Sequence, residues 1–310
     1  GENTLDQVFG DFDDDGDVDM VALNENSSMV YYDNLRQGYF NDLTKKSGLI
    51  HKGKPSSLTV ADYNNDGHLD IYICDLEGNH SLYKNKGDAI FVYDNKLLQL
   101  NPRLKTFAAK KAEFADIDND GYLDLIIAGS PIGNAKNNSG VILLHNDRLG
   151  GFIDASNSLP LIQYPVDFTA TSDIDNDGDL DLIIRQNYNA IVLRNDGGNI
   201  NNHLKVRLAG LRTGSSKNNY FGIGSKLELK AGGLYQMRSV NKPVNHFGLG
   251  DRGQGDVIRV LWSNGVPQNH LSPKKNQTIV ETQILKGSCP YLFAWNGSKF
   301  DFVTDVLWPS

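Results

Sequence analysis

The sequence DIDNDGDLD at residues 173–181 is the fourth copy of a nine-residue pattern, after DFDDDGDVD (11–19), DYNNDGHLD (62–70) and DIDNDGYLD (116–124). Successive copies begin 51, 54 and 57 residues apart, and together they hold 18 of the 38 acidic residues in the chain. Carboxylates packed this densely repel one another unless a cation neutralises them. The chain is therefore organised as an internal repeat of about 50 residues around four acidic loops.

These loops have the composition of a site for a hard, oxygen-seeking cation. When each copy is numbered 1 to 9, positions 1, 3, 5 and 9 are Asp, apart from Asn64, and position 6 is always Gly. Position 7 varies among Asp, His and Tyr, so we expect only its backbone carbonyl to bind. Carboxylates on alternate residues of a tight loop, one carbonyl and a closing carboxylate are ligands that calcium prefers. We expect about four calcium ions, with these candidate ligands: Asp11, Asp13, Asp15, Asp17, Asp19, Asp62, Asn64, Asp66, His68, Asp70, Asp116, Asp118, Asp120, Tyr122, Asp124, Asp173, Asp175, Asp177, Asp179 and Asp181.

Two other interpretations of the loops are weaker. An EF-hand needs a bidentate Glu at position 12 and a helix on each side, but position 12 is Ala22, Ile73, Ile127 or Ile184. A tight turn without a ligand is also rich in Asp, Asn and Gly. Four copies in register favour the metal site over this simple turn.

The residues around each loop alternate with a period of two, which predicts strands. A third strand ends in Asn34, Asn85, Asn146 or Asn195, and six residues later Phe40, Phe91 and Phe152 open a fourth strand, whereas the last copy has Asn201. The residue before each loop is small (Gly10, Ala61, Ala115, Ser172), as expected where neighbouring units crowd together. The repeat therefore predicts an all-β fold of four-stranded blades of about 50 residues, the size of a propeller blade.

The loops and the Asn-x5-Phe strands resemble the FG-GAP or VCBS repeats of calcium-binding β-propellers. The resemblance covers roughly residues 1–200. Because propellers of this family usually close with more than four blades, it implies that the sequence is a fragment of a longer protein.

Composition changes after residue 200, where the acidic loops stop. Strands are predicted at 203–208, 225–230, 235–240, 256–262 and 278–285, which indicates a small β-sandwich-like domain over residues 201–285. The motifs N-x-L-x-V-x-L from Asn202, H-F-G-L-G from His246 and the strand ending in Trp262 resemble the ASPIC/UnbV domain that follows such repeats in secreted proteins of the cartilage acidic type. Residues 286–310 form a tail with a predicted hairpin at Asn296-Gly297. We interpret His246 as structural and Trp262 as part of the core.

Composition excludes several classes of protein. The formal net charge is −8, so nucleic acid is not an expected partner. No apolar run approaches the roughly 20 residues of a membrane helix. The two cysteines, Cys74 and Cys289, are too few for a disulfide scaffold.

The expected function is a non-enzymatic, secreted or otherwise extracytoplasmic binding or adhesion module for a protein or glycan. Extracellular loops of this kind bind calcium at about 0.1–1 mM, above the free concentration in cytosol. The alternative is a glycan-active hydrolase or lyase, which needs two acids of divergent pKa facing one cleft. Nearly all the clustered acids fall on repeated positions, which favours the first hypothesis.

Overall fold

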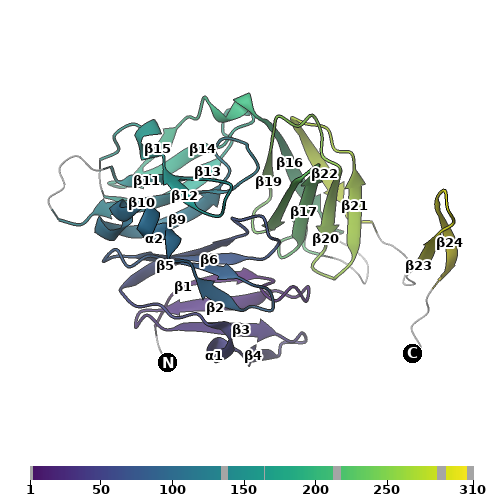
Figure 1. Ribbon diagram of the computed structural model, residues 1–310, viewed down its shortest axis with the longest axis horizontal. Helices are drawn as coiled ribbons and strands as arrows, with labels where there is room; N and C mark the ends of the chain where they lie inside the picture. Colours follow the sequence, from purple (N-terminus) through teal and green to yellow (C-terminus); the bar gives the residue numbers. More distant parts are fainter. Residues whose placement is uncertain (1–2, 134–138, 164, 212–217, 285–290, 306–310) are drawn as a thin grey trace.

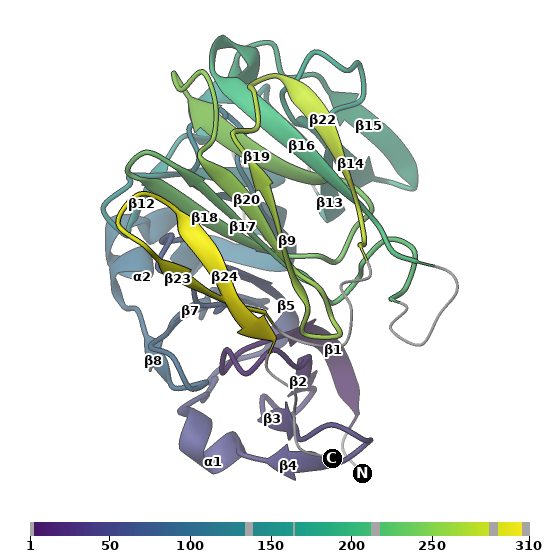
Figure 2. The same cartoon turned by 90° about the vertical axis from the view of Figure 1, so that its right-hand side faces the viewer.

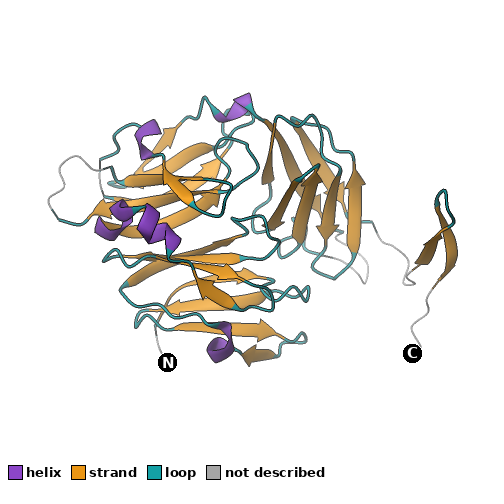
Figure 3. Ribbon diagram, in the orientation of Figure 1, coloured by secondary structure: helices purple, strands orange, loops and turns teal. Residues whose placement is uncertain are grey.

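The computed structural model describes residues 3–133, 139–163, 165–211, 218–284 and 291–305 (Figure 1). The predicted all-β fold is confirmed, because strands dominate the described chain and helices are single turns (Figure 3). In the repeat region, three sheets contain four antiparallel strands each. Their strands are β1 (Thr4–Gly10), β2 (Asp19–Asn24), β3 (Met29–Asn34) and β4 (Phe40–Asp42); β5 (Pro55–Ala61), β6 (Asp70–Asp75), β7 (Ser81–Asn85) and β8 (Phe91–Tyr93); and β9 (Phe107–Ala115), β10 (Asp124–Pro131), β11 (Val141–Asn146) and β12 (Phe152–Asp154).

The fourth sheet has three strands: β13 (Val166–Ser172), β14 (Asp181–Gln186) and β15 (Asn189–Leu193). Its repeat has Asn201 where the other copies have the Phe that opens a fourth strand, so the loss of that strand follows the sequence pattern. Short helices α1 (Thr44–Ser47) and α2 (Lys96–Leu100) and the 3₁₀ turns η1 (Pro102–Thr106), η2 (Ser156–Ser158) and η3 (Gly198–Ile200) lie in the connections. We call the four sheets blades 1 to 4.

The blades follow one another as in a propeller, with the first strands of successive blades, β1, β5, β9 and β13, in contact. Large side chains fill the space between blades, for example Phe12 of loop 1 against Phe91 of blade 2 (ring centroids 5.9 Å apart). The small residue before each loop has the expected role at Gly10, where an added Cβ would lie 2.4 Å from Leu69 Cδ1 of the next blade. Close packing between blades therefore explains this part of the repeat.

The second domain is a sandwich of two sheets, as the sequence predicts (Figure 2). One sheet has the order β19 (Asn245–Gly250), β16 (Asn202–Ala209), β22 (Gln277–Thr282), with β16 and β22 parallel. The other has the order β18 (Leu234–Ser239), β17 (Lys226–Ala231), β20 (Val257–Leu261), β21 (Pro267–Leu271). Apolar side chains of both sheets meet in one core that contains Trp262, which is buried as expected. The strands β19 and β21 were not among those predicted from the sequence.

The tail contains the predicted hairpin, β23 (Tyr291–Trp295) and β24 (Phe300–Asp305), with Asn296-Gly297 in its turn. It stands apart from both domains in Figure 1. Cys74 is a buried free thiol in β6. Cys289 lies outside the described residues.

Candidate metal centres in the repeated loops

Each acidic loop is a tight turn built from its own carboxylates. The backbone N–H of the position-6 glycine donates to the position-1 carboxylate in all four loops, at 2.9–3.2 Å. The position-5 N–H donates to the position-3 side chain at 3.1–3.3 Å, and the position-7 N–H donates to position 5. The glycine has φ between 89° and 104° in every copy, a region that only glycine adopts without strain. The turn therefore requires Gly and aims its carboxylates at one point.

The turn brings three carboxylates together in every loop. Oxygen atoms that lie within 4.8 Å of one another come from Asp11, Asp13 and Asp15 in loop 1; Asp62, Asp66 and Asp70 in loop 2; Asp116, Asp118 and Asp120 in loop 3; and Asp173, Asp175 and Asp181 in loop 4. A further group joins Asp118 and Asp124 to His145. Asn64 stands beside the second group, with its Oδ1 and Nδ2 hydrogen-bonded to Asp66.

The side chains at position 7 lie outside these groups. Asp17 pairs with Arg36, His68 Nδ1 lies 2.6 Å from Asp14 of loop 1, and Asp179 accepts the N–H of Asn199. At position 5 of loop 4, Asp177 also lies outside the group of its loop, and it accepts a hydrogen bond from the Asn199 side chain. The position-7 side chains of loops 1, 2 and 4 therefore have partners outside their groups.

The carboxylate at position 9 is a structural brace. Asp124 accepts the N–H of Ile117 through Oδ2 (3.1 Å) and the N–H of Asn146 through Oδ1 (2.9 Å). Asp19 and Asp181 make the same two bonds in loops 1 and 4. All four position-9 side chains are buried. The brace joins the start of each loop to the end of the third strand, so position 9 shapes the loop whether or not it also binds a cation.

In blades 2 to 4, the Asn at or just after the end of the third strand links its blade to the preceding one, a role that was not predicted from the sequence. Its side-chain N–H donates to the position-2 carbonyl of the preceding blade, from Asn85 to Phe12 (2.7 Å), from Asn146 to Tyr63 (2.8 Å) and from Asn195 to Ile117 (2.8 Å). The recurrence of Asn in every copy was the available signal.

Position 4 also links one loop to the next. Asn65 donates to the carbonyl of Gly121 (3.0 Å) and Asn119 to that of Gly178 (2.9 Å), while Asp14 pairs with His68. These residues and Asn176 have φ of 56–63°, which Asn and Asp tolerate better than other side chains. Asn or Asp at position 4 therefore suits both the turn and the contact.

Burial makes the negative charge of the loops costly. It raises the pKa of Asp62 to about 7, with the charge of Asp66 acting in the same direction, and the pKa of Asp11 to about 6. Burial also raises the pKa of Asp116 well above its usual range, followed by the charges of Asp124 and Asp120. The protein alone therefore does not balance these carboxylates, and a divalent cation would.

Unpaired oxygen atoms show that the loops fit a cation. Asp11 Oδ1, Asp70 Oδ2 and Asp173 Oδ1 are buried and have no hydrogen-bond partner within the described residues. Every converging ligand in these three loops is an oxygen, which suits a hard cation such as calcium and not a soft metal. Loops 1, 2 and 4 thus each keep a free ligand atom.

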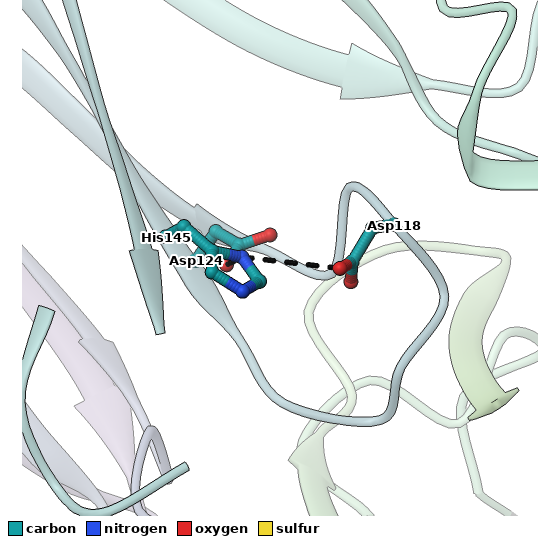
Figure 4. Close-up of side chains that lie close together, drawn as sticks. All are labelled: Asp118, Asp124 and His145. Atoms are coloured by element: carbon teal, nitrogen blue, oxygen red, sulfur yellow. Dashed lines mark ion pairs between the residues drawn. The ribbon is translucent and has the colours of Figure 1, made fainter. Parts of the chain in front are cut away.

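Loop 3 has an additional neighbour, His145, from the end of β11 (Figure 4). Its Nδ1 lies 3.0 Å from Asp124 Oδ1 and 3.9 Å from Asp118 Oδ2. The hydrogen bond with Asp124 raises the pKa of His145 to about 9 against the effect of its burial. The corresponding residues of the other blades are Asp33, Lys84 and Arg194, so no repeated signal marked this position in the sequence.

The second domain contacts the loops of three blades. The Lys226 ammonium lies 2.6 Å from Asp14 of loop 1, and Lys205 pairs with Asp173 of loop 4. The N–H of Gly248 donates to Asp116 Oδ2 of loop 3 at 3.1 Å. His246 is buried and its Nε2 lies 2.5 Å from Asn119 Oδ1 of the same loop. The candidate metal centres therefore lie beside the boundary between the two domains.

Comparison with known families agrees with this architecture. The family described as FG-GAP-like repeat matches residues 11–73, 63–127 and 116–184, more than half of the chain. The family described as ASPIC and UnbV matches residues 214–284. The chain belongs to the FG-GAP-like repeat proteins, and its second domain is of the ASPIC and UnbV type.

Curated relatives are similar over most of this chain. Cartilage acidic protein 1 of Mus musculus is 25% identical over 276 residues, and that of Homo sapiens is 25% identical over 280 residues. Each alignment covers 84% of this chain, which spans only 42% and 41% of the length of these relatives.

Solved structures give weaker likenesses. A lectin of Agrocybe aegerita that recognises non-reducing terminal N-acetylglucosamine has a TM-score of 0.42 and 22% identity, over 61% of this chain and 48% of the lectin. The V. cholerae biofilm matrix protein Bap1 has a TM-score of 0.37 and 13% identity, over 85% of this chain and 47% of that protein. Likenesses of this size carry no argument about function. In the described part of the chain, no helix has the length and apolar character needed to cross a membrane.

Proposed function

We propose that the protein is a non-enzymatic, extracytoplasmic binding module whose four loops each hold a calcium ion. The observation that carries this proposal is the convergence of three carboxylates in each of four equivalent turns. Four calcium ions would supply a charge of about +8 against the formal −8 of the chain. The residues that would hold them are those at positions 1, 3 and 5, the position-7 carbonyl and, where an oxygen remains free, position 9.

In this proposal calcium has a structural role. The loop carboxylates also accept hydrogen bonds from their own turns, and the position-9 brace and the position-4 contacts tie each loop to its blade and its neighbours. A cation bound there would hold blades and second domain in place, since Asp116 also accepts an N–H from Gly248. Binding of a protein or glycan is then left to residues other than these carboxylates, on the exposed connections where functional residues are often carried.

Two arguments support a non-enzymatic, extracytoplasmic role. Within the described residues, every group of three or more converging acids or histidines includes repeated loop positions, whereas an active site should break a repeat. Loops of this type bind calcium at about 0.1–1 mM, a concentration found outside the cytosol.

A binding array tests the proposal. The full chain would be applied to immobilised glycans and matrix proteins at millimolar calcium and again after chelation. We expect selective binding that chelation weakens and no change in the mass of any bound glycan. Release of glycan fragments, abolished by one Asp→Asn change that preserves calcium content, would instead establish the glycan-active enzyme.

A further inference from the structure

A cleft of about 480 Å³ separates blade 4 from the second domain. The sheet β19-β16-β22 lies beside blade 4 in both views of the molecule (Figures 1 and 2). One wall carries Ser172 and Asn176 from the end of β13 and from loop 4, and the other carries Arg207 of β16 and Thr278 of β22. The volume falls within the range of about 300–1,000 Å³ that is usual for small-molecule sites.

The cleft is cationic in an acidic protein. Lys205, Arg207 and Lys242 line it, against the single carboxylate of Asp173. Lys205 is already paired with that carboxylate, and Lys242 has Glu113 at 3.8 Å. Arg207 is exposed and makes no ion pair with any residue that the structure describes. The Arg207 guanidinium is therefore available to bind an anion, and Lys242 is a second cation in the same lining.

The neutral groups of the cleft suit a hydroxyl-rich ligand. Ser172, Asn176 and Thr278 are exposed on its walls. Asn176 occupies position 4 of loop 4, where Asn65 and Asn119 of loops 2 and 3 donate to the following loop. After loop 4 the sequence has no further acidic loop, and Asn176 is exposed in the lining of the cleft.

A buried histidine contributes to the same lining. His246 lines the cleft, is only 8% exposed, and its Nδ1 has no hydrogen-bond partner in the described part of the chain. Buried polar atoms are normally paired, and each exception calls for a partner that protein atoms do not supply. This nitrogen is itself buried, so a ligand in the cleft contacts the exposed lining residues and not this atom.

The geometry points to this cleft as a binding site for an anionic sugar, one that carries a carboxylate or a sulfate. Arg207 and Lys242 bind the anionic group, while Ser172, Asn176 and Thr278 exchange hydrogen bonds with sugar hydroxyls. The inference deepens the proposed binding function and rests on it, because it assigns that function a ligand class and a location. The mixture of cations with several hydroxyl and amide groups favours a sugar over an acidic peptide, which presents few hydroxyls.

Calorimetry with a heparin-derived tetrasaccharide tests the site, since this probe carries both uronate and sulfate. The calcium-loaded full chain should bind it, and Arg207→Gln and Lys242→Gln should each weaken binding by about tenfold or more, the usual effect of losing a hydrogen bond to a charged group. Arg259→Gln is the matched control, because Arg259 is exposed on β20 of the same domain and outside the cleft. It should leave affinity unchanged. Thr278→Trp, which fills the cleft from an exposed position, should abolish binding while calcium content stays constant.

Modified probes separate the sources of the anion. A desulfated tetrasaccharide keeps only carboxylates, and a desulfated, carboxyl-reduced one is neutral and should not bind. Equal weakening by Arg259→Gln, tight binding of the neutral probe, equal binding of poly-glutamate, or no binding of the charged probe at millimolar concentration would each overturn the assignment.

If the cleft variants leave binding on the array intact, the binding function stands and only its location is wrong. If the wild type binds nothing on the array, the function itself fails.

Discussion

The blades and the second domain are stabilised in different ways. Each blade buries a position-9 carboxylate, and blades 2 and 3 also bury Asp62 and Asp116 at position 1. The second domain buries no carboxylate among its described residues and has an apolar core that includes Leu204, Phe247 and Trp262. A blade can therefore bury carboxylates when a cation is available to neutralise them. The sandwich of the second domain is stabilised by the packing of its apolar core.

Calcium removal should destabilise the blades far more than the second domain. This is the largest effect that we expect. At free calcium about 100 times the dissociation constant, each site contributes roughly 2.7 kcal/mol, so four sites contribute roughly 10 kcal/mol. The melting temperature of the blades should fall by roughly 20 °C or more on chelation. All three tryptophans lie at or after residue 262, so their fluorescence does not report on the blades, whereas far-UV circular dichroism does.

In chelator we expect the dichroism of the blades to change at a lower temperature than the tryptophan fluorescence. In calcium the two transitions should lie closer together. A melting curve that is the same with and without calcium would remove the distinction between the two regions.

Removing the core tryptophan should affect the second domain regardless of calcium. Trp262→Ala is expected to cost about 3–5 kcal/mol, because it leaves a large cavity in a packed core. Urea unfolding followed by circular dichroism should give the same loss with calcium and with chelator. Trp295→Ala is the control, since Trp295 is exposed in the tail hairpin and should cost little. A loss that appears only in chelator would mean that the second domain also depends on calcium.

The links between blades provide a smaller test. Asn146→Ala removes the buried donor to Tyr63 and Leu123 carbonyls and should cost about 1–3 kcal/mol. Asn34→Ala is the matched control, because Asn34 occupies the same position in blade 1. Among the described residues, its side-chain N–H donates only to the carbonyl of Val18 in its own blade. Equal losses of stability in chemical denaturation would show that the bond within the blade, and not the link between blades, carries the effect.

Loop 2 should bind calcium most weakly of the four loops. Adding a carboxylate to it should give the smallest of the effects predicted here. Asn64→Asp adds a carboxylate at a ligand position and should tighten calcium binding roughly threefold, because ligand charge governs affinity. Asn65→Asp adds the same charge at position 4, where the side chain contacts Gly121 instead of the candidate site. A calcium titration in which both variants gain affinity equally would show that net charge, and not ligand number, sets the order.

Much of the fold could be predicted from the repeat. The acidic loop, the Asn and the Phe recur at the same places in successive copies, and they mark where the strands of a blade begin or end. The fourth strand is absent from the last blade, where Asn201 replaces the Phe that opens this strand in the other copies. The strand β19 was not recognised, since His246 and the glycines beside it do not alternate as an exposed strand does, and all but its last residue are buried. Burial on both faces removes the period-two signal.

The candidate site could be predicted only in part. Local spacing predicted that each loop gathers carboxylates, but not which three converge. Asp177 of loop 4 lies outside its group, whereas Asp70 and Asp181 at position 9 lie inside theirs. The contacts of Asn146 with Tyr63, of His145 with Asp124 and of Lys205 with Asp173 join residues far apart in sequence. A single sequence carries no signal for such pairs until the blades and the second domain are packed together.

The calcium content of the chain tests the central claim most directly. The protein would be saturated with calcium, freed of excess metal by rapid desalting, and analysed for bound metal together with a calorimetric titration of the metal-free form. We expect about four calcium ions per chain, with one ion lost when Asp116 is changed to Ala. A chain that holds no calcium, or a single ion, would contradict it.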